Sequence, residues 1–229
     1  MTAVDPLRPV ERRSAEARAL EALRDAIVSG GLAQGSRITE IDLSNRLDVS
    51  RATVRSALHT LAAEGLVIQT PYAGWAVLSL GPDDVWELLT LRASLEGLAG
   101  RLAAERHADS ERPRLEAAMD DLRAACMNGT PDEVAEADFR LHETIVALAG
   151  HGRLSEHYRR LRTQVRLHIN AGDALVFDKS EIIGQHEPIV RAVLARDAAL
   201  AGSLSEQHNL TEGQLLLDRV EADFAMSGA

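Results

Sequence analysis

Apolar residues recur every three or four positions over most of the chain, which is the spacing of an amphipathic helix. The sequence is also rich in Ala, Leu, Arg and Glu, which favour helices. Six segments beyond residue 80 carry the pattern, and glycine-containing breaks separate several of them. The helices expected there span 83–106, 111–127, 132–149, 154–169, 180–195 and 198–223. Together they predict a helical bundle of about 150 residues.

The first 80 residues predict a different unit. Helices are expected at 14–29, 40–47 and 51–64, and the last of them begins after Ser50, a favourable N-cap residue. The only strand pattern lies at 67–80, where apolar residues surround a turn at 71–74 and predict a hairpin. We place the domain boundary near residue 80, with one domain at 1–80 and an all-helical domain at 81–229.

Composition and charge agree with two soluble modules. Of the 229 residues, 45% are apolar and 26% charged, an ordinary balance for a globular protein. The net charge is −10, yet residues 1–80 carry nine arginines against nine acidic residues, so the second domain holds all of the excess. Because the first domain is not basic overall, binding to nucleic acid requires arginines gathered on one face.

The sequence pattern predicts neither a membrane helix nor a secretion signal nor an internal disulfide. No apolar run approaches the roughly 20 residues of a membrane helix, and residues 1–10 do not resemble a secretion signal. Cys126 is the single cysteine and cannot form an internal disulfide. We therefore expect a cytoplasmic protein with no membrane partner.

The first domain has the order of a helix-turn-helix: two short helices, a tight turn and a third helix. Val54 and Leu58 share a face that can pack inward, while Arg55 and His59 project on the other side. Arginine can read guanine or bind phosphate, and the hairpin would be a wing along the DNA backbone. The alternative is an amphipathic helix whose arginines merely face solvent. The predicted DNA-contacting residues are Arg37, Ser50, Arg51, Thr53, Arg55, His59, Tyr72 and Gly74.

Several stretches of this domain resemble the winged-helix signature of the GntR family of bacterial transcription regulators. They are residues 50–58, Leu61, residues 64–67 and the preceding loop at 31–38, and the resemblance covers about residues 15–78. It implies that the partner is a double-stranded DNA operator and that Arg51 and Arg55 occupy DNA-contacting positions. Thr53 stands where proline is common in the family, Asp48 where glycine is usual, and Ile41 where some members have a DNA-contacting arginine.

The second domain places four polar residues on apolar helix faces. Asp138 and His142 are four residues apart and share the inward stripe of one helix, and His186 and His208 lie on the apolar faces of two others. Burying such groups without partners is costly. A divalent cation would compensate all four, since imidazole and carboxylate suit Zn, Ni, Mn or Fe. The alternative is that each histidine is separately hydrogen-bonded in the core. We expect His107, along with His151 and His157, at the surface.

This domain resembles the helical FCD ligand-binding domain of the FadR subfamily over about residues 83–212. Metal-binding members carry an Asp-x3-His helix and two later histidines about 22 residues apart, which matches the positions of the four residues above. Residues 92–96 resemble the first-helix signature, whereas 150–152 depart from the usual Gly-Asn. The resemblance implies a homodimer, a divalent metal ion (Zn, Ni or Mn) and a small organic-acid effector. The candidate anchors for that acid are Arg92, Arg162, Arg166 and Asn170. The alternative is that these arginines pair with surface carboxylates.

Three functional classes fit a helical protein with such a site: a ligand-responsive transcriptional repressor or activator, a metal-dependent enzyme acting on small organic acids, and a helical interaction module. The sequence has no His-Glu-x-x-His motif and no Gly-rich phosphate loop. Glu143 and Glu187 each follow a predicted ligand directly, which turns them about 100° away from it. An interaction module would leave the four inward polar residues unexplained. We therefore predict a regulator rather than an enzyme, with the metalloenzyme as the alternative.

Overall fold

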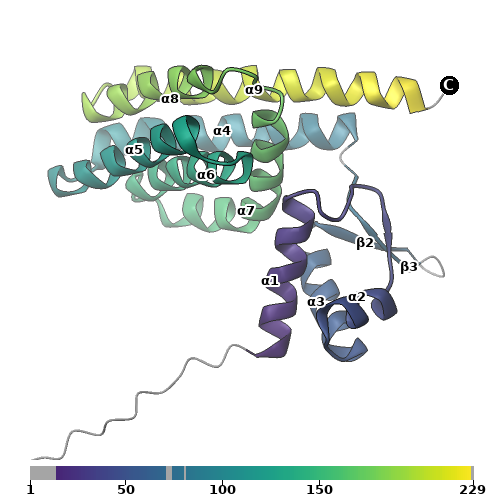
Figure 1. Ribbon diagram of the computed structural model, residues 1–229. Helices are drawn as coiled ribbons and strands as arrows, with labels where there is room; N and C mark the ends of the chain where they lie inside the picture. The colour runs from purple at the N-terminus through teal and green to yellow at the C-terminus, as the bar shows by residue number, and fades with distance from the viewer. Residues whose placement is uncertain (1–13, 71–73, 80, 228–229) are drawn as a thin grey trace, which may run out of the picture. The chain divides into compact units, whose positions relative to one another are not determined.

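The computed structural model describes residues 14–70, 74–79 and 81–227 (Figure 1). Contacts divide them into two compact units that meet at Leu78 and Ser79. The mainly α fold predicted from the sequence, with a winged helix-turn-helix followed by a helical bundle, is confirmed. Among the described residues, no helix combines the length and the apolar stretch that crossing a membrane requires.

The first unit contains three helices and a small antiparallel sheet. The helices are α1 (Ala15–Val28), α2 (Glu40–Leu47) and α3 (Arg51–Ala63), and the strands are β1 (Arg37–Ile38), β2 (Val67–Thr70) and β3 (Gly74–Val77). The side chains of Ser14, Thr39 and Ser50 each accept a hydrogen bond from a backbone N–H of the first turn, which explains where the three helices begin. Asp48 adopts a left-handed conformation with φ of 51° and makes the tight turn between α2 and α3.

The sheet has one more strand than the sequence predicted. β3 lies in the middle, in the order β1-β3-β2, with Ile38 opposite Trp75 and Val67 opposite Val77. The prediction that strands occur only at 67–80 was therefore wrong. A strand of two residues is too short to show an alternating pattern, and β1 exists because its backbone groups pair with the free edge of β3.

The second unit is a bundle of long helices. They are α4 (Pro82–Arg106), α5 (Arg112–Asn128), α6 (Pro131–Leu148), α7 (Gly152–Asp173), α8 (Lys179–Leu194) and α9 (Ala198–Ser227), with the short 3-10 turn η1 (Asp109–Glu111) before α5. Leu115, Phe139, Leu141 and Ile182 are fully buried in its core. The expected helices were correct in number and order, but α7 and α9 each continue about four residues beyond their predicted ends.

α4 and α9 run side by side along the bundle and make its most extensive helix contact (Figure 1). Glycines permit this close approach. A Cβ on Gly100 would lie 2.7 Å from the Ala201 carbonyl oxygen, and one on Gly213 would lie 2.9 Å from Leu89 Cβ. The pairing of α4 with α9 brings side chains of α4 to the region where α6, α8 and α9 meet.

Candidate functional site

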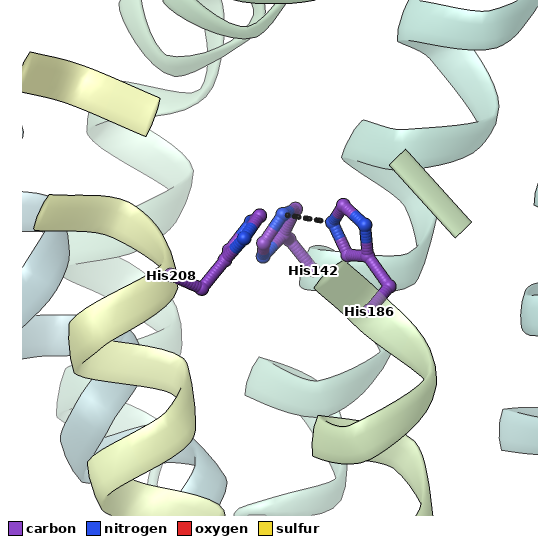
Figure 2. Close-up of side chains that lie close together, drawn as sticks. All are labelled: His142, His186 and His208. Carbon is purple, nitrogen blue, oxygen red and sulfur yellow. Dashed lines mark hydrogen bonds between the residues drawn. The ribbon is translucent and has the colours of Figure 1, made fainter. Parts of the chain in front are cut away.

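The four predicted metal ligands converge inside the second unit. Asp138 and His142 come from α6, His186 from α8 and His208 from α9, and all four are buried. The ring centroids of the three imidazoles lie 4.3–5.2 Å apart, and one nitrogen from each lies within 4.8 Å of the others (Figure 2). The alternative considered from sequence, a separate hydrogen bond for each histidine, describes Nδ1 of His142 and of His186 but not His208, which makes no hydrogen bond among the described residues.

Neighbouring groups fix which nitrogen faces the centre. His186 Nδ1 lies 2.7 Å from the Ile182 carbonyl oxygen, and His142 Nδ1 lies 2.6 Å from Glu96 Oε2, so each neutral ring donates through Nδ1. The two Nε2 atoms then carry lone pairs, yet they face each other at 3.2 Å. Two lone pairs repel at that distance unless a proton or a metal ion lies between or beside them.

Asp138 adds a carboxylate to the same point. Its oxygens lie 3.0 Å from His142 Nε2 and 3.4 Å from His186 Nε2. Within the described part of the chain, neither Asp138 oxygen and neither ring nitrogen of His208 makes a hydrogen bond of acceptable geometry. Buried polar atoms are rarely left in this state. The donor set, three imidazoles and one carboxylate, therefore fits a divalent transition-metal ion.

The pKa values of the buried groups describe the charge of the cluster when no metal ion is bound. Burial opposes protonation of His142, but Glu96 and Asp138 outweigh burial and raise its pKa to about 10. Burial likewise opposes the charge on Asp138, yet the adjacent His186 and His142 lower its pKa well below the usual range. The carboxylates thus attract positive charge into the core, and a metal ion would supply it by displacing protons.

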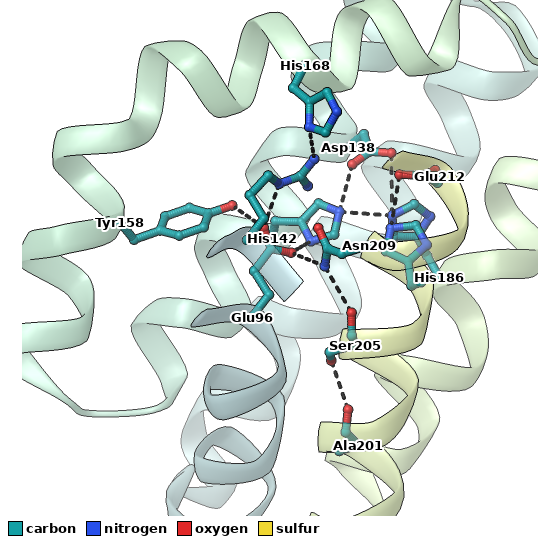
Figure 3. Close-up of polar contacts among 12 residues, drawn as sticks. Glu96, Asp138, His142, Tyr158, His168, His186, Ala201, Ser205, Asn209 and Glu212 are labelled. Carbon is teal, nitrogen blue, oxygen red and sulfur yellow. Dashed lines mark hydrogen bonds and ion pairs between the residues drawn. The ribbon is translucent and has the colours of Figure 1, made fainter. Parts of the chain in front are cut away.

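Sequence reasoning missed Glu96, which organises a buried network beside the histidines (Figure 3). Besides His142, its carboxylate accepts hydrogen bonds from the Tyr158 hydroxyl at 3.0 Å and the Asn209 amide at 3.0 Å. It also pairs with Arg92 at 3.0 Å. The available signal was the i,i+4 spacing of Arg92 and Glu96, which resembles an ordinary surface ion pair until the fold buries it.

Two further carboxylates lie at the cluster. One oxygen from each of Asp138, Asp173 and Glu212 lies within 4.8 Å of the others, and Glu212 Oε2 is 3.3 Å from His208 Nε2. Burial and the charge of Asp138 raise the pKa of Asp173 to about 9 and that of Glu212 to about 7. Glu212 follows His208 by one helical turn, a spacing visible in the sequence that was not used.

The predicted effector anchors occupy two environments. Arg92 is buried beside Glu96, its Nη1 lies 3.2 Å from His168 Nδ1, and its Nη2 makes no hydrogen bond within the described residues. Burial, reinforced by Arg92, lowers the pKa of His168 to about 3, so this histidine is neutral. Arg162 and Arg166 instead contact carboxylates of α6, at 3.5 Å and 3.0 Å respectively. Asn170 is half-buried on the same helix, α7.

The remaining histidines correct one expectation. His107 was expected at the surface, but it is buried, and its Nδ1 lies 2.8 Å from the Ala103 carbonyl oxygen. It is the C-cap of α4, where the backbone leaves the helical conformation, so the helical periodicity of the sequence does not predict which way its side chain points. His157 is exposed, and His151 is half-buried and accepts a hydrogen bond from Leu154 N as the N-cap of α7.

The first unit presents its predicted DNA contacts on α3 and the sheet. The side chains of Arg51 and Arg55 are 60% and 55% exposed, as groups that reach DNA must be. Arg55 makes a two-point ion pair with Glu40, at 2.7 and 2.8 Å. Ser50 and Thr53 share a hydrogen bond of 2.8 Å at the N-terminus of α3.

The other predicted contacts lie around the sheet. His59 packs edge-on against Trp75 with ring centroids 5.0 Å apart, and Trp75 Nε1 donates to Glu40 at 3.4 Å. Arg37 in β1 and Gly74 in β3 are exposed. Tyr72 lies outside the described residues. Glu40, which sequence reasoning missed, thus connects the helix bearing Arg55 with the strand bearing Trp75.

Comparisons with known proteins agree with this division of the chain. The profile of the gntR family of bacterial regulatory proteins matches residues 15–77, and the FCD domain profile matches residues 87–211. The "Probable D-xylose utilization operon transcriptional repressor" of Paenarthrobacter nicotinovorans is 32% identical over 190 residues, which cover 81% of this chain and 79% of the relative.

Solved structures show the same architecture. A GntR-type regulator from Rhodococcus sp. RHA1 superposes with a TM-score of 0.74 at 26% identity, covering 90% of this chain and 99% of the other. E. coli McbR/YncC also gives a TM-score of 0.74, over 91% of this chain and 99% of the other, and its 18% identity makes the likeness one of fold alone.

Proposed function

The chain belongs to the GntR family of bacterial regulatory proteins and carries an FCD domain; on this basis we propose that it is a ligand-responsive, metal-binding transcription regulator. In this proposal a homodimer reads a near-palindromic DNA operator in the cytoplasm, and a small organic acid bound in the helical domain changes operator affinity. The observation that carries the proposal is the convergence of three imidazoles and Asp138 on one buried point.

The metal ion would be held by Asp138, His142, His186 and His208. When bound, it supplies Lewis acidity and open coordination positions for a carboxylate oxygen. Glu96 supports the site because it holds His142 Nδ1 and thereby directs Nε2 at the centre. Zinc, nickel and manganese all accept this donor set.

The acid would be recognised by charge as well as by the metal. Arg92 is the best-supported anchor, since its Nη2 makes no hydrogen bond among the described residues and belongs to the buried network that reaches His142 through Glu96. Arg162, Arg166 and Asn170 stay in the proposal as anchors on α7. The relative from P. nicotinovorans is named for D-xylose utilization, but a neutral sugar offers no carboxylate to these groups. We expect carboxylic acids, rather than D-xylose, to bind here.

DNA reading is proposed for α3 and the hairpin. The N-terminal half of α3 enters the major groove with Arg51 and Arg55, while Arg37, Gly74 and Tyr72 lie near the backbone. In a dimer, two DNA-binding units related by a twofold axis require a near-palindromic operator. The dimer would have two conformations, one that binds the operator and one that does not. The acid can change operator affinity only if it binds one of these conformations more tightly than the other.

A metal-dependent enzyme is the second candidate, favoured by the same centre because a metal with open positions can activate water. The two functions differ in what happens to the acid. An enzyme converts it, whereas a regulator returns it unchanged and responds in DNA affinity.

One experiment on the purified protein distinguishes the regulator from the enzyme. Metal content is measured by mass spectrometry after dialysis, and operator binding is followed by fluorescence anisotropy with short-chain mono-, di- and hydroxycarboxylic acids and with D-xylose. The proposal expects about one metal per chain, an acid-dependent change in operator affinity and recovery of the acid intact. Chemical turnover of the acid would favour the enzyme, and a metal-free protein indifferent to acids would contradict the proposal.

A further inference from the structure

Glu212 is the carboxylate of α9 that reaches the histidine cluster without a predicted role. It follows His208 by four residues, so the two side chains leave the same face of the helix. Its side chain is 13% exposed, and its Oε2 lies 3.3 Å from His208 Nε2. Burying a carboxylate at this depth is costly unless a cation or a hydrogen bond compensates it.

A hydrogen bond to His208 does not provide that compensation. Despite the 3.3 Å separation, both ring nitrogens of His208 are without a hydrogen bond among the described residues, and its side chain is only 3% exposed. The imidazole nitrogen and the carboxylate oxygen are close neighbours that do not bond to each other. This is the relationship of two ligands that face a common third atom.

The spacing of the cluster agrees with that interpretation. In an octahedral complex with bonds of about 2.1 Å, adjacent donor atoms lie about 3.0 Å apart, and opposite ones about 4.2 Å. The observed neighbours are separated by 3.0 Å for Asp138 and His142, 3.2 Å for His142 and His186, and 3.3 Å for His208 and Glu212. The oxygens of Glu212 and Asp138 lie within 4.8 Å of each other, so the two carboxylates are close enough to share one ion.

We propose that Glu212 is a fifth protein ligand of the metal ion, in addition to Asp138 and the three histidines. The inference rests on the metal site proposed above and specifies its coordination. Five protein ligands leave one octahedral position, so an organic acid binds through a single oxygen unless it displaces Glu212. The carboxylate of Glu212 thereby competes with the effector and sets how readily the site accepts it.

Asp173 supplies a matched comparison. It belongs to the same group of three carboxylates and is buried, so replacing it with a neutral amide disturbs the same buried polar cluster. Only Glu212, however, stands beside a histidine nitrogen at ligand spacing in the contacts described above. Glu212→Gln and Asp173→Asn each replace one carboxyl group while keeping the size of the side chain, so they separate loss of a ligand from a general disturbance of the buried carboxylates.

The test uses full-length protein, cobalt(II) as the probe and a competing chelator, with thermal melting of the metal-free variants to verify folding. We expect Glu212→Gln to weaken cobalt binding at least about ten-fold and to change the visible d–d spectrum. Asp173→Asn should keep the wild-type spectrum and affinity within about three-fold. In Glu212→Ala, added acetate should fill the vacated position and restore the wild-type spectrum.

The contrary results are distinct. If Glu212→Gln binds cobalt with wild-type affinity and spectrum, or if Asp173→Asn loses as much as Glu212→Gln, then Glu212 is not a ligand. Failure of acetate to alter the spectrum of Glu212→Ala also overturns the assignment. Failure of the wild-type chain to bind cobalt at all contradicts the proposed metal site itself, and the fifth ligand with it.

Discussion

The orientation of single imidazoles decides what the helical domain can bind. His142 and His186 each use Nδ1 for a fixed acceptor, Glu96 and the Ile182 carbonyl, and so present Nε2 to the centre. The inward placement of Asp138, His142 and His186 followed from helical periodicity, because their apolar neighbours share one face. Glu96 could not be predicted in the same way, since its contact with His142 joins helices that are distant in sequence.

Removing one imidazole should remove the metal. His186→Ala deletes a buried, proposed ligand and leaves Asp138 and His142 without their neighbour, so the metal content should fall from the expected one per chain, or about that, to a small fraction under the same dialysis. Operator affinity without effector should remain close to wild type, since α3 is untouched. The matched control is His157→Ala, an exposed histidine of the same unit. Full metal occupancy in the His186 variant would refute the ligand assignment.

Metal affinity should also depend on pH. In the cation-free protein the pKa of His142 is about 10, above its ordinary value of 6.5, because nearby Glu96 and Asp138 outweigh burial. A metal ion must displace that proton, so the affinity should rise as pH increases from 6.5 towards 10 and fall below that window. Chelator competition at several pH values measures this, and the chelator's own pH dependence is corrected with a protein-free titration. An affinity that does not vary with pH would count against proton displacement.

The proton on His142 also contributes to the folding stability of the metal-free protein. The folded pKa is raised, so the stabilisation is fully present below the unfolded value of 6.5 and is lost as pH rises through about 10. The direction is therefore opposite for the two states of the protein: alkaline pH weakens the cation-free fold and strengthens metal binding.

On the DNA-reading helix, Arg55 is the most informative single residue. Its side chain is 55% exposed beside the largely buried Glu40, so the guanidinium can exchange the carboxylate for a base or a phosphate. Arg55→Ala should weaken operator binding by about 1–3 kcal/mol if it reads a base. Fluorescence anisotropy with operator DNA measures the loss. Arg160→Ala, which removes an exposed ion-paired arginine of the helical domain, is the control, and equal affinities in the two variants would contradict the assignment.

At the scale of elements, the residues at which helices begin can be predicted from local sequence, whereas the helices that pack against each other cannot. Ser50 and Thr39 cap helices where the sequence predicted them to begin. The sequence did not reveal that α4 packs along α9, because the glycines that permit the approach are spaced along both helices with no local signature. β1 was missed for a related reason, since its pairing with β3 is a tertiary contact.

The glycine contact between α4 and α9 gives a paired test. Gly100→Ala should destabilise the domain by about 1–3 kcal/mol, because the new Cβ meets the Ala201 carbonyl. Gly184→Ala, in α8 with open space around it, should stabilise by up to about 1 kcal/mol through helix propensity. Urea denaturation at equal metal load measures both changes in the free energy of unfolding. Two changes of the same sign would show that close packing at Gly100 is not what limits this position.

At the scale of the whole molecule, function depends on two units with different charge. The DNA-reading unit contains as many acidic residues as arginines, so binding relies on the placement of Arg51 and Arg55 rather than on net charge. The helical unit carries the acidic excess and gathers part of it around one buried point. Trp86 of α4 and Phe224 of α9 are large apolar side chains that lie exposed on this unit.

The central claim is that a divalent metal ion is bound by Asp138, His142, His186 and His208, and anomalous X-ray diffraction tests it most directly. Crystals of protein purified without chelators are measured on both sides of the absorption edge of the metal identified by mass spectrometry. We expect one strong anomalous peak per chain, about 2.0–2.2 Å from the donor atoms of these four residues. The account would be contradicted if there were no peak between α6, α8 and α9. It would also be contradicted if the metal ion lay elsewhere and the three imidazoles pointed away from one another.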